Sequence, residues 1–138
     1  MNERFAAAIA LVRTLSDDAD CHEAEAVNKA IAAALGYHLF APTNLPYWSV
    51  SRDPNANPYD HPENADTLFE LPDFVNDLKV AISVTPAEYD FNLRRRGDVW
   101  TATCHRPNGS EISVGSSRID ARAVILAALL ALAAATQS

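Results

Sequence analysis

The C-terminal end of the chain is a long apolar segment, and it restricts the possible folds more than any other feature. Residues 123–135 carry no charged side chain and are mostly alanine. The segment is too short to span a bilayer, which takes about 20 apolar residues. A helix that is apolar around most of its circumference is either buried in the fold or paired with another chain. We expect part of it to face a partner, so the sequence predicts a homo-oligomer through the C-terminal helix.

Three segments of alternating polar and apolar residues precede this helix, namely residues 88–95, 99–106 and 111–115. Gly97-Asp98 separates the first two segments, and an Asn-Gly turn signal at Asn108-Gly109 separates the last two. The pattern predicts an antiparallel β-meander. The final helix is expected to begin near Ser117, with Asp120 placed as in a capping box.

Three further helices are expected before the meander. The first covers residues 2–15, and the second follows a cap at Asp20 and stops at Gly36. The third starts around Pro72-Asp73 and ends before Pro86, because proline suits a helix start and not its interior.

A long proline-rich loop is expected at about residues 42–66, since five prolines there exclude a helix. Residues 37–41 and 47–51 are expected to be extended. Three aromatic side chains in or beside this loop are candidates for stacking on a ligand, because loops display side chains that a sheet would bury. They are Tyr47, Trp48 and Tyr59.

These elements predict one α+β domain over residues 1–138, with an antiparallel β-meander and helices packed on the sheet. The chain has the commonest size for a single domain. Two domains of half this length would each bury too little surface to be stable.

The net charge of −7 argues against binding to nucleic-acid backbones. The chain contains none of the glycine-rich phosphate-binding, P-loop or nucleophile-elbow motifs, and its histidines lack metal-ligand spacing. Cys104 and His105 are adjacent, so on a strand they point to opposite faces and cannot form a nucleophile–base pair. We therefore expect no enzyme activity, no metal site, no cofactor and no membrane span, and a cytoplasmic location.

Arg118 and Arg122 are the main candidate binding residues. They are four residues apart, so they share a face in the first turns of the final helix. The N-terminal end of a helix attracts anions and disfavours cations, so two arginines there need either a bound anion or neighbouring carboxylates. Asp120 and Glu111 could supply the carboxylates, which leaves a surface ion-pair network as the alternative to a phosphate site.

Arg94 and Phe91, in the first strand of the meander, are secondary candidates. Arg94 belongs to a run of three arginines before the Gly97-Asp98 turn, and it either adds to the same positive patch or lies on a solvated hairpin tip. Phe91 alternates with polar neighbours and fits either the core or a stacking surface.

From about Leu71 to Ala135 the chain resembles the phage α-β-α sandwich domain family, small proteins of phages and prophages. The residues that carry the resemblance are the Thr85-Pro86 turn into the first strand, the hairpin at Gly97-Asp98 and the final apolar helix. The resemblance implies an α-β-α sandwich. The proline-rich insertion departs from the family pattern.

Some small phage proteins of this build are similar to the anti-Thoeris sponges, oligomers that bind and hide cyclic ADP-ribose-type signals of bacterial immunity. This similarity rests on Arg118, Arg122 and Phe91, and it implies that they bind the ligand. The sequence thus predicts a phage anti-defence protein that sequesters a cyclic nucleotide-type small molecule without catalysis. Replacing both arginines with alanine is expected to abolish binding and leave the melting temperature nearly unchanged.

Two other functions fit the sequence. The acidic side chains of the N-terminal half could dock on a basic host protein, so that the chain inhibits a host defence factor. The C-terminal helix could instead build an assembly, as in a structural or accessory phage protein without a ligand.

Overall fold

The computed structural model describes residues 2–42, 46–56, 68–107 and 111–135. Within these residues the chain forms four helices and two three-stranded antiparallel sheets. In chain order the elements are α1 (Glu3–Thr14), α2 (Cys21–Ala34), β1 (His38–Phe40), β2 (Ser49–Ser51), β3 (Phe69–Glu70), α3 (Leu78–Val84), β4 (Asp90–Arg96), β5 (Val99–His105), β6 (Ile112–Ser117) and α4 (Asp120–Ala135).

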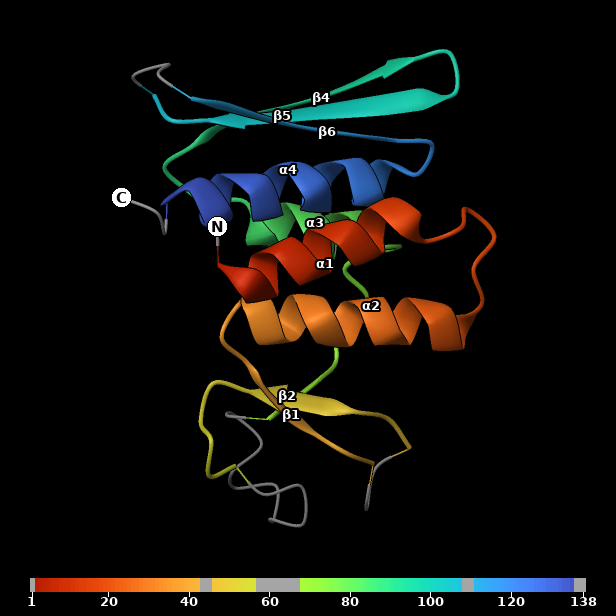
Figure 1. Cartoon of the computed structure of the whole chain (residues 1–138), viewed down its shortest axis with the longest axis vertical. Helices are drawn as coiled ribbons and strands as arrows, with labels where there is room; N and C mark the ends of the chain where they lie inside the picture. Colours follow the sequence, from red (N-terminus) through yellow and green to blue (C-terminus); the bar gives the residue numbers. More distant parts are fainter. Residues whose placement is uncertain (1, 43–45, 57–67, 108–110, 136–138) are drawn as a thin grey trace.

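The helices lie between the two sheets (Figure 1). The sheet β4-β5-β6 packs on α4, α3 lies against α4, and α1 contacts both α4 and α2. The small sheet β1-β2-β3 follows beyond α2. The α+β class and the antiparallel β-meander are therefore confirmed. The α-β-α order of layers is not confirmed, because helices form the middle of the stack and a second sheet closes its other end.

The ends of α1 and α2 follow from local sequence. Asn2 caps α1 by accepting a hydrogen bond from the Arg4 N–H at 2.8 Å, and the Asp20 side chain accepts one from the Glu23 N–H at 2.8 Å. Gly36 has a φ of 92°, and the Tyr37 N–H reaches back to the Ala32 carbonyl at 3.0 Å. This is a Schellman motif, which needs the left-handed conformation that glycine adopts without strain.

The two extended pieces flanking the start of the proline-rich segment pair with each other as β1 and β2, with His38 opposite Ser51. A third strand, β3, pairs with β2 and was not expected, because two residues give no alternating pattern. Trp48 is covered on its ring face by the Lys29 ammonium, 3.9 Å from the ring centroid. Residues 43–45 and 57–67, with Tyr59 among them, lie outside the described residues.

The third helix begins later than its spacing predicts. Phe74 and Val75 are buried in a turn, and α3 starts only after Asp77, whose side chain accepts a hydrogen bond from the Lys79 N–H at 3.1 Å. The turn is held from α2, because the Asn28 side chain donates to Asp73 and accepts from the Val75 N–H. A side chain 47 positions away thus helps to hold the turn that precedes this helix.

The C-terminal helix is the centre of the fold. It is therefore covered by its own chain, and the prediction that it forms the contact between subunits is wrong. No described residue of α4 is exposed, since β5, β6, α1 and α3 cover it. Strand β6 continues through Ser117, opposite Trp100, and delays the helix start to Asp120. None of the helices in the described part of the chain is long and apolar enough to cross a membrane.

Small residues let α4 and β6 approach each other closely. Gly115 lies opposite Ala102 in the sheet, on the face that packs on α4. A Cβ atom on Gly115 would lie 2.2 Å from the Ala123 carbonyl oxygen and 2.7 Å from the Ala127 nitrogen. The alanine content of α4 is therefore explained by close packing inside one chain.

The two thiols have different surroundings and should therefore differ in reactivity. Cys21 is exposed, whereas Cys104 is 1% exposed on the α4 side of β5, and burial raises the pKa of its thiol. Because the thiolate is the reactive form, we expect one thiol per chain to react rapidly with a disulfide reagent and the second only after denaturation. A Cys21→Ser variant should lose the rapid reaction. A rapidly reacting thiol in that variant would contradict the buried position of Cys104.

Candidate functional site

Arg122, in the first turn of α4, lies against the C-terminal end of α1. The residue is 2% exposed. Its Nη1 donates hydrogen bonds to the carbonyl oxygens of Leu15 at 3.1 Å and Ser16 at 2.8 Å. Leu15 is the C-cap of α1 and Ser16 follows it, so the guanidinium lies at the negative dipole end of this helix. Arg122 thereby ties the turn after α1 to the start of α4.

The Arg122 guanidinium is incompletely compensated. Asp17 Oδ1 lies 4.0 Å from its Nη1, and no hydrogen-bond acceptor among the described residues reaches its buried Nε. Burial lowers the pKa of Arg122 from its ordinary value, and the negative charges of Asp17 and Asp73 offset only part of this effect. A buried donor without a partner is uncommon and costs about 1–3 kcal/mol, so this nitrogen needs an explanation.

Arg118 lies in the bend between β6 and α4, so the prediction that it shares a helix face with Arg122 is wrong, and its environment is different. Its side chain is 67% exposed, with its Nε 3.6 Å from Asp98 and its Nη1 4.0 Å from Asp17. These partners come from the β4–β5 turn and from the turn after α1, in place of the expected Asp120 and Glu111. Exposed ion pairs of this kind contribute little to stability, so Arg118 remains available for a ligand.

Both arginines line one pocket of about 290 Å³ at the N-terminal end of α4. Its walls come from the last turns of α1, the turn after α1, the end of β6 and the first turns of α4. Arg13 of α1 also lines it, and no described carboxylate lies within ion-pair distance of Arg13. The full lining is Val12, Arg13, Leu15, Asp17, Ser116, Ser117, Arg118, Arg122 and Leu126.

The pocket is lined by three arginines and one aspartate, and Asp98 lies beside Arg118 outside the lining, so the pocket keeps a net positive charge. Asp17 lies 4.0 Å from nitrogen atoms of both Arg118 and Arg122, and Ser116 and Ser117 add hydroxyl groups. The pocket can therefore hold an anion such as a phosphate through charge-assisted hydrogen bonds. Hydrolysis would need a general base next to a nucleophile. The lining offers one carboxylate for that role, and it is already shared between two arginines.

Phe91 and Arg94 do not join this pocket. Phe91 lies opposite Cys104 on the face of the sheet that packs on α4, while Ser117 at the pocket lies opposite Trp100. Four residues along a strand separate these two rows, or about 13 Å. Arg94 lies opposite Thr101, so its side chain is on the other face of the sheet, away from α4.

The pocket contains one basic residue that sequence reasoning missed. Arg13 is in the last turn of α1, where a basic side chain is expected simply to complement the helix dipole. Its role at the pocket follows only from the packing of α1 on α4. The chain offered no sequence signal for this convergence, because residues 13 and 118 are far apart in sequence.

The described residues of the site show no arrangement of metal ligands, and the chain matches none of the proteins compared with it. In the described ranges, no three histidine, cysteine, aspartate or glutamate side chains converge in a way that could hold a metal ion. Comparison of the chain with protein families, curated proteins and solved structures finds no match.

Proposed function

We propose that this protein binds and sequesters a small phosphate-bearing ligand, without catalysis, in the pocket formed by Arg13, Arg118 and Arg122. One observation carries the proposal. The Nε of Arg122 is buried without a partner at a pocket that two further arginines line. An anion in this pocket would supply the negative charge that the buried guanidinium lacks.

The size of the pocket narrows the ligand class. A volume of about 290 Å³ lies at the lower limit for small-molecule sites, about 300 Å³. It suits a phosphate or diphosphate group with part of a sugar, and any base would then lie outside it. A nucleotide-derived immune signal of the cyclic ADP-ribose type or a cyclic oligonucleotide has this composition. The resemblance to phage anti-defence proteins supports the same class.

Binding is expected to depend on Arg118, because its side chain is exposed and reaches the pocket without holding the fold together. Replacing Arg118 with alanine should weaken binding of the best ligand about tenfold or more, the effect of one charge-assisted hydrogen bond. Calorimetric titration with cyclic ADP-ribose isomers, cyclic di- and trinucleotides and pyrophosphate measures this. Recovery of the ligand intact after heat denaturation of the complex would separate sequestration from turnover.

Arg94→Ala is the matched control, since Arg94 is an equally charged and exposed arginine on the far face of the sheet. It should bind as tightly as the parent chain. Equal losses in both variants would mean that net charge, and not this pocket, governs binding. Tight binding that Arg118→Ala leaves untouched would refute the site.

A further inference from the structure

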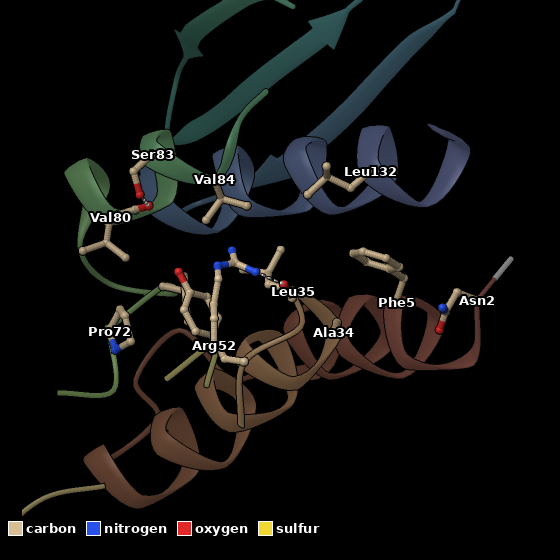
Figure 2. Close-up of a pocket in the computed structure, with 12 residues that line it drawn as sticks. Asn2, Phe5, Ala34, Leu35, Arg52, Pro72, Val80, Ser83, Val84 and Leu132 are labelled. Atoms are coloured by element: carbon tan, nitrogen blue, oxygen red, sulfur yellow. Dashed lines mark hydrogen bonds between the residues drawn. The ribbon is translucent and has the colours of Figure 1, made fainter. Parts of the chain in front are cut away.

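A second and larger cleft lies at the opposite ends of α1 and α4, about 590 Å³ in volume. Figure 2 shows α3 and α4 on one side of it and α1 and α2 on the other. Its walls are mainly apolar, with Phe5 below and Val80, Val84 and Leu132 above. This volume is typical of small-molecule sites, which are mostly apolar with a few placed polar groups.

Arg52 brings a positive charge into this apolar cleft. The residue follows β2 directly, and Figure 2 shows its guanidinium reaching into the gap between Leu35 and Val84. Its Nη1 donates a hydrogen bond to the Leu35 carbonyl oxygen at 3.0 Å, and the guanidinium lies 4.3 Å from the Tyr37 ring centroid. These two contacts fix the orientation of the side chain.

The local sequence explains why these residues meet. The glycine cap at Gly36 ends α2 and turns the chain so that Tyr37 enters β1. Pairing of His38 with Ser51 then places Tyr37 and Arg52 next to each other at the end of the strand pair. The Leu35 carbonyl is one of the last of α2, so it attracts the cation.

Most of the binding capacity of Arg52 is unused. A guanidinium has five N–H donors, and the contact with Leu35 uses one of them. No carboxylate of the described residues lies within ion-pair distance of Arg52. Among the described residues that line the cleft, Arg52 is the one with a formal charge. The charge of Arg52 is therefore balanced by a ligand with a single negative charge, whereas a phosphate monoester would bring close to two negative charges.

We propose that this cleft binds a monocarboxylic acid with an apolar body. The carboxylate accepts two parallel hydrogen bonds from Arg52, and the apolar body lies between Phe5, Val84 and Leu132. Two features of the cleft set this ligand class: the planar guanidinium matches a carboxylate in bidentate geometry, and the walls favour hydrocarbon over a sugar or a base. This site is separate from the arginine pocket, which contains residues from the other ends of α1 and α4.

Calorimetric titration with octanoate, octan-1-ol and octylammonium tests the proposal, because the three probes share a chain and differ in charge. We expect octanoate to bind one per chain, octan-1-ol about tenfold more weakly or worse, and octylammonium not at all. Octanoate should also shift the methyl NMR signals of Val80, Val84 and Leu132. Equal affinity for octanoate and octan-1-ol, or no binding of octanoate, would overturn the proposal.

Variants locate the two halves of the site. Arg52→Met should weaken octanoate about 30-fold, and Arg52→Lys, which keeps the charge but not the planar fork, should lie between it and the parent chain. Val84→Phe narrows the apolar part of the cleft and should weaken octanoate binding while leaving Arg52 in place. Arg94→Met and Arg118→Ala are controls and should bind octanoate normally. Unchanged binding by Arg52→Met or by Val84→Phe, in variants with a cooperative thermal transition, would exclude this cleft.

Discussion

Replacing Gly115 with alanine is expected to destabilise the protein by more than about 3 kcal/mol, beyond the usual range for overpacking. The added methyl group would lie 2.2 Å from the Ala123 carbonyl oxygen and 2.7 Å from both the Ala127 nitrogen and the Leu126 Cβ. Two of these atoms belong to the backbone of α4, which cannot move aside as a side chain can. Either β6 or the whole helix must shift, and α4 also packs on α1 and α3.

Chemical denaturation followed by circular dichroism measures this loss. Gly97→Ala is the matched control, because Gly97 has a φ of 65° but an added Cβ would meet nothing within 4 Å. Only backbone strain acts at Gly97, at a cost of roughly 1–2 kcal/mol. Gly115→Ala should therefore be clearly the less stable variant. If it were as stable as the parent chain, α4 could not lie this close to β6.

Replacing Arg122 with alanine is expected to cost about 3 kcal/mol of stability, the typical loss when a buried charged group is removed from its partners. The variant removes the Arg122 hydrogen bonds to the Leu15 and Ser16 carbonyls, of which Ser16 keeps its bond from the Ala19 N–H, and opens a cavity at the junction of α1 with α4. For a domain of this size the melting temperature should fall by about 10 °C. Differential scanning calorimetry measures the change.

Arg118→Ala is the control for that experiment, since its side chain is 67% exposed and its ion pairs are long. It should melt within about 2 °C of the parent chain, as surface substitutions usually do. A similar loss in both variants would show that the two arginines act as one network. An unchanged Arg122→Ala would mean that its contacts with α1 contribute nothing.

The expected stabilities of the Arg122 and Arg118 variants decide which of them can be used to test ligand binding. The sequence predicts that removing both arginines abolishes binding and spares stability, because it places both side chains on an open helix face. Arg122 is buried, so we now expect the double variant to lose stability as well. Loss of binding in any Arg122 variant would be mixed with loss of structure. Arg118 and Arg13 are therefore the residues to change when binding is measured.

The sequence by itself determined the elements whose ends depend on near neighbours. Asp20 and Gly36 mark the two ends of α2, through hydrogen bonds that span three to five residues. The β-meander follows from alternation and from its turns, and its register is as regular as the pattern implies. The α+β class and the nearness of Arg118 and Arg122 to the start of α4 were predictable for the same reason.

Only the tertiary structure decided what the apolar helix packs against and what the arginines do. An apolar circumference is equally compatible with a partner chain and with a central position, and the close approach at Gly115 decides for the central position. Arg122 bonds to carbonyls 106 and 107 residues away, and Arg52 meets the end of α2 through strand pairing. Such contacts depend on how layers stack, which periodicity and capping do not specify, because those patterns act only over a few residues of the chain.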